Sequence, residues 1–342
     1  MLPETTPEMT PETTLLTPGT QPGAPRFSVI MNVYNGERWL RDALDSVVAQ
    51  TCGDWELIFW DDQSKDGSAA VLQPYLADPR MRYFHAPVQT PLGEARQQAI
   101  EQARGSWLAF LDQDDFWTPD KLAEQARVID AWRGPPLAIV YGRAMKFGVL
   151  QTLVDFDRWH EFQPLPQGDI FQALFADSCF ICQSAVCLAT AAVREIGPIP
   201  DEHHFCPDYY FYTALSARYA TACTQQVVCW YRIHSAAMSR QHYLSVMQEM
   251  LSILERWRWR LPGAVYQRRR RIQHSLIGLR HITTGSDPAG GLAHIWHHGS
   301  LPYLFERPFV QIWRRLRRAW HQRKHGVPRL PAALAGAPSG HP

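Results

Sequence analysis

The amino-acid sequence predicts an α/β fold, in which a mostly parallel sheet is flanked by helices and followed by a helical C-terminal extension. From residue 27 onward, short apolar segments alternate with helical segments, strand then helix, four times in succession. This order is typical of right-handed βαβ units and a parallel sheet. Hydrophobic residues make up 46% of the 342 residues, enough for a substantial core. No apolar run reaches the length of about 18 residues that spans a bilayer.

The first strand is expected at Phe27–Met31 and the first helix at Arg38–Ala49. The next three strand and helix pairs and a fifth strand are expected at Glu56–Trp60, Ser68–Leu76, Met81–Phe84, Gly93–Ala103, Trp107–Leu111, Pro119–Trp132 and Ala138–Tyr141. In the fourth helix, Pro119 suits the first turn and Thr118 the N-cap. Further along, Ser178–Leu188 is apolar enough to be a buried strand.

Charge and composition divide the chain into three regions. Residues 1–25 are rich in Thr, Pro and Glu and lack the pattern of a signal peptide, which predicts a disordered leader. Residues 1–240 carry 18 Lys and Arg against 29 Asp and Glu, whereas residues 241–342 carry 16 against 4. We therefore expect one acidic domain at 26–240, with halves at about 26–142 and 143–240, and a basic, mainly helical extension with a flexible end at 241–342.

Carboxylates are dense in two loops that follow predicted strands. These loops are Asp61–Gly67 and Asp112-Gln113-Asp114-Asp115. In open α/β sheets, ligands bind beyond the carboxyl ends of the strands. Close carboxylates repel one another unless a cation or solvent relieves them, and Mg²⁺ or Mn²⁺ prefers oxygen ligands together with substrate phosphates. The alternative is a solvated acidic turn before a helix. Neither a G-x-G-x-x-G nor a P-loop motif is present, which disfavours dinucleotide and P-loop sites.

Four segments in this order resemble the family 2 glycosyltransferases, and the resemblance extends from about Phe27 to about Ser239. They are Ser28-Val29-Ile30-Met31-Asn32-Val33-Tyr34-Asn35, Ser46-Val47-Val48-Ala49-Gln50-Thr51, Trp60-Asp61-Asp62-Gln63-Ser64-Lys65-Asp66-Gly67-Ser68 and Phe110-Leu111-Asp112-Gln113-Asp114-Asp115. The resemblance implies an A-type (GT-A-like, Rossmann-type) fold. It also implies a divalent cation, Mg²⁺ or Mn²⁺, held by a D-x-D motif, and inversion at the anomeric carbon.

The resemblance also implies roles for residues of the donor half. Tyr34 is expected beside the nucleotide base, and Asp62 is expected to accept a hydrogen bond from it. Asp112 is expected at the ribose or in the metal shell. Asp114 is expected to contact the metal at the donor diphosphate, and Asp115 either shares that task or orients the loop. Arg96 resembles a helix-start arginine near the donor, although a solvated helix residue paired with an acid is an equal alternative.

In the second half, Asp208 occupies the position at which the family has the base that deprotonates the acceptor hydroxyl. Pro207 replaces the first acid of the usual pair. A carboxylate needs partial desolvation to act as such a base. The alternative for Asp208 is an N-cap of a helix at Tyr209–Ala217. The resemblance places Arg232 and His234 at the diphosphate or the metal, although a lone histidine is more often structural.

Basic and aromatic residues in the extension point to a surface role. Phe309, Trp313, Leu316 and Trp320 share one helical face beside arginines, as in a helix that lies on an anionic membrane. Packing on the protein itself or on another subunit is an equal alternative. Nucleic acid is a weaker alternative, despite the run at Arg268–Arg271.

Seven cysteines, an odd number, predict reduced thiols and a reducing cytosol. The C-x-x-C spacing of Cys179 and Cys182 is compatible with a zinc site, but no second C-x-x-C or H-x3-H follows. Thiols buried in the core are therefore favoured. We expect a cytoplasmic protein at the inner face of the cell membrane.

The sequence thus predicts transfer of a sugar from a nucleoside-diphosphate sugar to a saccharide or lipid-linked saccharide, in bacterial surface polysaccharide or glycoconjugate synthesis. Two alternatives stay open. A metal-dependent nucleotidyltransferase also arranges carboxylates at the end of a parallel sheet. A scaffold whose site has decayed is conceivable because Asn32, Gln63 and Pro207 depart from the family pattern.

Overall fold

The computed structural model describes residues 23–148, 164–176, 179–300 and 303. Most of the leader expected at 1–25 and the amphipathic helix expected at 309–320 lie outside the described residues. The contacts of the chain divide it into two compact units. The first comprises residues 1–158 and 165–253, and the second comprises residues 159–164 and 254–342. The domain boundary expected near residue 240 stays a prediction.

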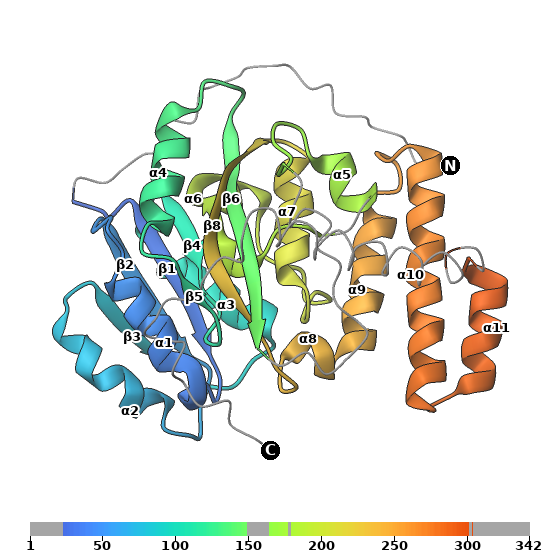
Figure 1. Cartoon of the computed structure of the whole chain (residues 1–342), viewed down its shortest axis with the longest axis horizontal. Coiled ribbons are helices and arrows are strands. Elements are labelled where there is room, and N and C mark those ends of the chain that lie inside the picture. Colours follow the sequence, from blue (N-terminus) through green and yellow to red (C-terminus); the bar gives the residue numbers. More distant parts are fainter. Residues whose placement is uncertain (1–22, 149–163, 177–178, 301–302, 304–342) are drawn as a thin grey trace, which may run out of the picture. The chain divides into compact units, whose positions relative to one another are not determined.

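Eight strands form one curled sheet in the first unit (Figure 1). They are β1 (Phe27–Val33), β2 (Trp55–Asp61), β3 (Met81–His85), β4 (Trp107–Phe110), β5 (Phe116–Trp117), β6 (Leu137–Gly148), β7 (Val186–Ala189) and β8 (Ala220–Ile233). Their order across the sheet is β3-β2-β1-β4-β7-β6-β8-β5. All residues of β2 are buried, as are all but one of β1, which fits strands covered on both faces.

The predicted α/β class is confirmed, although the sheet is more mixed than expected. Strands β1, β2, β3 and β4 pair in parallel, as the βαβ pattern predicts. Strand β7 pairs antiparallel with both β4 and β6, and β5 pairs antiparallel with β8. The fifth predicted strand, β6, therefore does not adjoin β4, because β7 from much later in the chain lies between them.

Helices flank the sheet, and the helical C-terminal region is present. The helices of the first unit are α1 (Glu37–Val48), α2 (Ser68–Leu72), α3 (Leu92–Glu101), α4 (Lys121–Ala131), α5 (Phe171–Ala176), α6 (Thr190–Ile196), α7 (Pro207–Ser216), α8 (Met238–Gln241) and α9 (Tyr243–Arg256), of which α9 runs into the second unit. The second unit also contains α10 (Gly263–Thr284) and α11 (Pro288–His298). In the part of the chain that the structure covers, no helix combines the length and apolar character of a membrane span.

Three predicted boundaries are wrong for local reasons. Helix α2 ends at Leu72 and continues as a 3₁₀ turn at Gln73–Ala77, because Pro74 has no N–H to donate to an α-helical bond. Helix α4 begins only at Lys121, with Asp120 rather than Thr118 as its N-cap residue. The strand expected at 178–188 is shorter than predicted, because a 3₁₀ turn at Gln183–Ala185 precedes β7, which begins at Val186.

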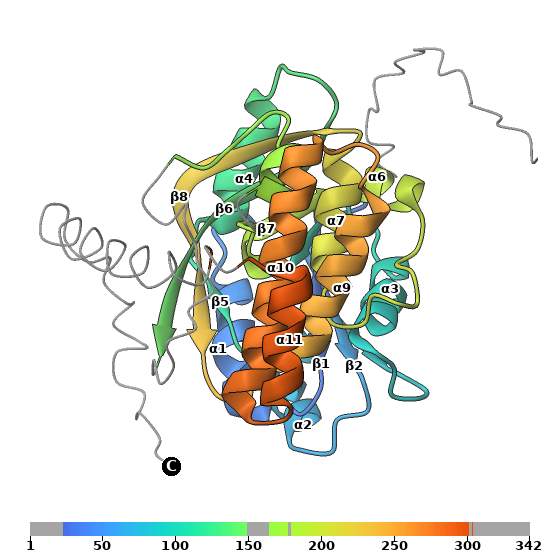
Figure 2. The ribbon, with the colours of Figure 1, turned by 90° about the vertical axis from the view of Figure 1, so that its right-hand side faces the viewer.

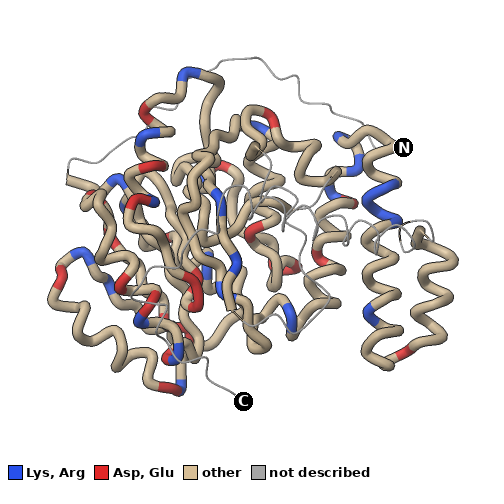
Figure 3. The backbone as a smooth tube through the Cα atoms, viewed as in Figure 1, with Lys and Arg blue, Asp and Glu red and all other residues tan. Residues whose placement is uncertain are grey.

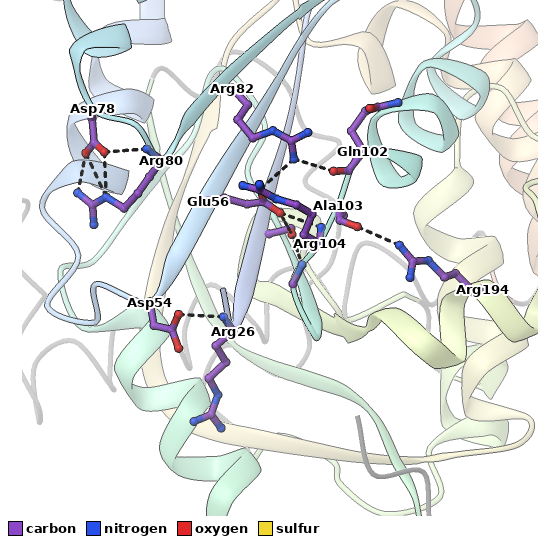
Figure 4. Close-up of polar contacts among 12 residues, drawn as sticks. Arg26, Asp54, Glu56, Asp78, Arg80, Arg82, Gln102, Ala103, Arg104 and Arg194 are labelled. Carbon is purple, nitrogen blue, oxygen red and sulfur yellow. Dashed lines mark hydrogen bonds and ion pairs between the residues drawn. The ribbon is translucent and has the colours of Figure 1, made fainter. Parts of the chain in front are cut away.

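A buried glutamate links the strands of the parallel half at the end opposite the acidic loops (Figure 4). The Glu56 side chain in β2 is 2% exposed and accepts hydrogen bonds from Ser28 of β1 (2.7 Å) and Arg82 of β3 (2.9 Å). Arg104, just before β4, also pairs with it (2.6 Å). These partners keep the pKa of Glu56 below its usual value although burial raises it, so the carboxylate stays charged at neutral pH.

Candidate active site

The loops after β1, β2 and β4 interlock at the carboxyl edge of the sheet. Gln113, in the acidic loop after β4, accepts a hydrogen bond from the N–H of Tyr34 (2.9 Å) and donates one to its carbonyl (3.1 Å). Asn35 accepts a bond from the N–H of Lys65 in the loop after β2 (2.8 Å). Asn35 and Gln63 both have positive φ, 50° and 67°. The predicted donor loops are therefore in mutual contact, and Gln113 is a linking residue that the predicted site had not included.

The residues expected at the nucleotide base differ in exposure. The Tyr34 ring is 40% exposed, whereas Asp62 is 6% exposed and accepts a bond from the N–H of Thr90 (3.2 Å). Burial raises the pKa of Asp62, and hydrogen bonds from Thr90 partly oppose this rise. A largely buried carboxylate with one backbone donor keeps free acceptor capacity, so Asp62 can accept a further hydrogen bond from a ligand.

In the acidic loop, Asp112 lies against a buried arginine. The guanidinium of Arg96 in α3 is 3.3 Å from the Asp112 carboxylate. The Arg96 side chain is 5% exposed and that of Asp112 is 39% exposed. Desolvation raises the pKa of Asp112 to about 7, with Arg96 opposing the shift and the charges of Asp114 and Asp208 adding to it. Arg96 is therefore not a solvated surface residue but the counter-charge of the acidic loop.

Asp114 and Asp115 point in different directions. The Asp114 carboxylate contacts Nε2 of His234 (2.7 Å), and its carbonyl accepts from Nε of Arg232 (2.9 Å). Asp115 is 1% exposed and accepts bonds from Ser184 Oγ (2.6 Å) and the N–H of Arg232 (2.8 Å). Burial raises its pKa well above the usual value. This geometry favours the loop-orienting role for Asp115 and leaves Asp112 and Asp114 as the carboxylates nearer the open side.

Arg232, near the end of β8, and His234, just after it, reach the acidic loop from the other side. Arg232 pairs with Asp42 of α1 (2.7 Å), and its guanidinium lies 4.6 Å from the ring centroid of Phe147. The His234 ring packs on Trp39, with centroids 4.0 Å apart. Within the described residues, Nδ1 of His234 and Nε of Arg96 are buried without a hydrogen-bond partner. Two unsatisfied polar atoms beside Asp112 and Asp114 fit a site that a ligand completes.

Asp208 lies in the first turn of α7. Its predicted alternative role as an N-cap is wrong, because Cys206 is the N-cap residue and Pro207 is the first residue of the helix. Burial raises the pKa of Asp208, and the positive charge of Arg96 is the largest opposing influence. Arg96 lowers the pKa of both Asp112 and Asp208, and Asp208 raises that of Asp112, so the charges of these three side chains interact.

A glutamate beyond the predicted domain holds the segment that carries Asp208. Glu249 in α9 is 8% exposed and accepts bonds from the backbone N–H groups of His204 (2.9 Å), Phe205 (2.9 and 3.0 Å) and Cys206 (2.9 Å). It thereby satisfies donors just before the helix start, which would otherwise lack partners. No local motif marks Glu249, so the sequence offered no signal for it.

A pocket of about 370 Å³ opens beside these elements. It is lined by Gln89, Thr90, Pro91, Leu92, His204, Phe205 and Met238. Its wall includes Thr90, which contacts Asp62, and His204 and Phe205, whose N–H groups bind Glu249. Among the described residues, its lining contains no carboxylate, and Asp62 is linked to its wall through the N–H of Thr90.

No disulfide joins the seven cysteines, all of which lie in the described part of the chain. Among the described residues, the side chains of Cys182 and Cys229 lie within 4.8 Å of the Asp115 carboxylate. Both oxygens of that carboxylate already accept protein hydrogen bonds. Cys187, in contrast, contacts Lys121 and Gln125 in the core.

Comparison with known proteins identifies a family for the segment that carries the loops after β1, β2 and β4. Residues 28–196 match the model of Glycosyl transferase family 2. The chain is 39% identical over 102 residues to the "Putative teichuronic acid biosynthesis glycosyltransferase TuaG" of Bacillus subtilis, a match that covers 30% of this chain and 40% of that protein. The chain thus spans well under half the length of this curated relative. Residues 28–196 thus match a family 2 glycosyltransferase domain, the family that the sequence resembles.

Solved structures show the same fold at low identity. The mannosyltransferase PcManGT from Pyrobaculum calidifontis, in complex with GDP-Man and Mn²⁺, aligns with a TM-score of 0.56 at 16% identity, over 87% of this chain and 83% of that one. S. aureus TarS 1–349 in complex with UDP-GlcNAc aligns with a TM-score of 0.51 at 17% identity, over 75% and 73%. The domain therefore has the predicted A-type fold.

Proposed function

We propose that this protein transfers a sugar from a nucleoside-diphosphate sugar to an acceptor hydroxyl with inversion at the anomeric carbon. The observation that carries the proposal is the shared influence of Arg96 on Asp112 and Asp208, because it joins the diphosphate side and the base in one site. Tyr34 and Asp62 would bind the nucleoside at the neighbouring loops. The nucleotide-sugar complexes of the structural neighbours support a donor of this class.

In the proposed reaction, the acceptor O–H gives its proton to the Asp208 carboxylate as its oxygen attacks the anomeric carbon. The bond from that carbon to the diphosphate oxygen breaks on the opposite face, and the nucleoside diphosphate leaves. The raised pKa of Asp208 makes it a stronger base than an exposed aspartate. No covalent enzyme intermediate is needed.

Asp112 and Asp114 are the residues that would hold a divalent cation. Their oxygen donors suit Mg²⁺ or Mn²⁺, and such an ion would neutralise charge on the leaving diphosphate. Arg232 and His234 both contact Asp114 and would keep it in place at the diphosphate. Asp115 would hold the loop from the interior through Ser184.

The acceptor is proposed as a saccharide or lipid-linked saccharide in bacterial surface polysaccharide or glycoconjugate synthesis, as the name of the Bacillus subtilis relative suggests for that protein. We further propose that the protein acts at the cytoplasmic face of the membrane. The residues expected to contact lipid, around Trp313 and Trp320, lie outside the described part of the chain.

The test begins with a thermal-shift screen of nucleoside diphosphates and their sugars, with and without Mn²⁺, because ligand binding raises apparent stability. The nucleotide sugar that stabilises the protein is then incubated with saccharide and lipid-linked acceptors. Acceptor-dependent release of a nucleoside diphosphate supports transfer. Release of pyrophosphate from a nucleoside triphosphate and a sugar phosphate would instead identify a nucleotidyltransferase, and failure to bind any nucleotide would identify a decayed scaffold.

Two variants separate the proposed roles. Asp208→Asn should nearly abolish transfer and leave donor binding intact, because it removes only the base. Asp114→Asn should nearly abolish transfer and also weaken Mn²⁺-dependent donor binding. Asp120→Asn, an exposed aspartate before α4, is the matched control and should resemble the wild type. Full activity of either site variant would remove that residue from the mechanism.

A further inference from the structure

Helices α10 and α11 of the second unit form an antiparallel hairpin (Figures 1 and 2). Gly285 ends α10 in the left-handed conformation, with φ of 69°. Asp287 then caps α11 by accepting a bond from the N–H of Gly290 (2.9 Å). Since the turn contains only three residues, side chains from the end of α10 and from α11 face one another.

Two glycines bring these helices into backbone contact. A Cβ at Gly278 would lie 2.7 Å from the carbonyl oxygen of Gly291, and a Cβ at Gly291 would lie 2.6 Å from that of Gly278. Such distances exclude a larger residue at either position without a shift of the helices. The close approach means that rings one turn away from the glycines, on either helix, can touch directly.

His274 and His294 lie one turn away from these glycines, and His298 lies one turn further along α11. His274 lies one turn before Gly278 on α10, and His294 and His298 are four residues apart on α11, on the same face. Their ring centroids form a nearly equilateral triangle with sides of 5.0, 5.2 and 5.3 Å. Nδ1 of His274 and Nε2 of His294 are 3.0 Å apart.

The ring centroids have the spacing of imidazoles on one tetrahedral ion, whereas the nitrogens of the three rings do not all lie within 4.8 Å of one another, so binding requires a ring to turn. With Zn–N bonds of about 2.0–2.1 Å, two imidazole nitrogens on one ion lie about 3.3 Å apart and their ring centroids about 5.2 Å apart. The nitrogens of His274 and His294 need to separate by only a few tenths of an ångström and lose the proton that they share. His298 is exposed, so its ring is free to turn a nitrogen inward.

The buried ring of His274 has a polar atom to spare. His274 is 8% exposed, and its Nε2 is buried without a hydrogen-bond partner among the described residues. Nδ1, which faces His294, is the ligand atom in this arrangement, and Nε2 points away from the ion.

The surroundings favour neutral imidazoles, the form that binds metal. Arg270, one turn from His274, is paired with Glu255 (3.3 Å), so its charge is partly compensated. Helix α11 contains no Lys, Arg, Asp or Glu, whereas Lys and Arg gather further back on α10 (Figure 3).

We propose that His274, His294 and His298 bind one Zn²⁺ ion, with water as the fourth ligand, and that this ion fastens α11 to α10. Imidazole ligands select zinc and neighbouring transition metals, whereas the oxygen ligands of the acidic loop suit Mg²⁺ or Mn²⁺. The two sites therefore differ in metal preference. The zinc site does not depend on the proposed transferase function.

The test uses the full-length chain without a histidine tag, freed of metal by a chelator. Zn²⁺ is titrated by calorimetry, and Co²⁺ is titrated with its visible absorption as the readout of nitrogen ligation. We expect one equivalent to bind, with the intense Co²⁺ bands of a four-coordinate site, and we expect excess Mg²⁺ not to displace it. An Asp114→Asn background, which lacks an acidic-loop ligand, should retain this binding.

Variants identify the ligands. His274→Gln and His298→Gln should each weaken Zn²⁺ binding by more than the roughly 10–100-fold that loss of an outer-shell partner costs. The matched control is His297→Gln, which removes the exposed neighbour of His298 and should keep wild-type affinity. Because His298 is exposed, its variant should fold even if the His274 variant does not. Absence of Zn²⁺ binding by the wild type, or equal affinity of His298→Gln and His297→Gln, would overturn the proposal.

Discussion

Glu249 offers the sharpest test of how helix α9 serves the proposed active site. It lies outside the residues that match the family model, yet its carboxylate binds three backbone N–H groups directly before α7. Asp208, the proposed base, is only two residues beyond the last of these donors. We predict that Glu249→Gln lowers both the stability of the first unit and the rate of transfer.

The expected magnitude follows from the contacts. The Gln amide keeps one acceptor oxygen, but its NH₂ group faces N–H donors that the lost oxygen had satisfied. Loss of one charge-assisted hydrogen bond and exposure of an unsatisfied donor cost about 2–4 kcal/mol together. For a unit of this size, that corresponds to a fall of about 5–10 °C in Tm.

The catalytic effect should appear in kcat. A displacement of about 1 Å at a reacting group can cost about 100-fold in rate. We therefore expect kcat to fall about 10–100-fold while the Kd of the donor, which binds at the other loops, stays within about twofold. Glu249→Asp should recover part of the rate, because it restores the charge at a shorter reach.

The measurements are thermal unfolding, steady-state transfer kinetics and donor binding. Glu101→Gln, at an exposed glutamate near the end of α3, is the matched control for loss of one carboxylate. If Glu249→Gln matched that control in both Tm and kcat, the carboxylate would not position the Asp208 segment.

Three further predictions follow from buried groups. Because Asp112 has a pKa of about 7, metal-dependent donor affinity should fall about tenfold per pH unit below 7, and calorimetry between pH 5 and 8 tests this; a flat profile would contradict it. Because the pKa of Asp112 is higher in the folded than in the unfolded protein, the charged carboxylate destabilises the fold above that pKa. Asp112→Asn should therefore stabilise the metal-free protein at pH 8 but not at pH 4, as measured by urea unfolding. Lys121 is fully buried and desolvation lowers its pKa, while its described contacts are Cys187 and the ring of Trp117 rather than a carboxylate. Lys121→Met should therefore raise the free energy of unfolding at pH 7 by about 1–3 kcal/mol. An unchanged or lower midpoint of urea unfolding would refute this.

The sequence by itself determined the parallel half of the sheet and the loops at its carboxyl edge. The apolar runs at β1, β2 and β4 are short, nearly continuous and separated by helical segments, so their type and order follow from local pattern. The acidic loop stood out for the same reason, because Asp112, Asp114 and Asp115 are adjacent in the chain.

Only the tertiary structure decided how distant segments complete the site. Strand β7 enters between β4 and β6 with antiparallel pairing, which no local periodicity indicates. Asp115 turns inward because Ser184 and the backbone of Arg232 meet it there. Glu249 and the histidine triangle depend on contacts between helices, and a single helix does not encode its partner. Chain-local patterns fix which elements form, whereas the position of each side chain depends on packing between residues far apart in sequence.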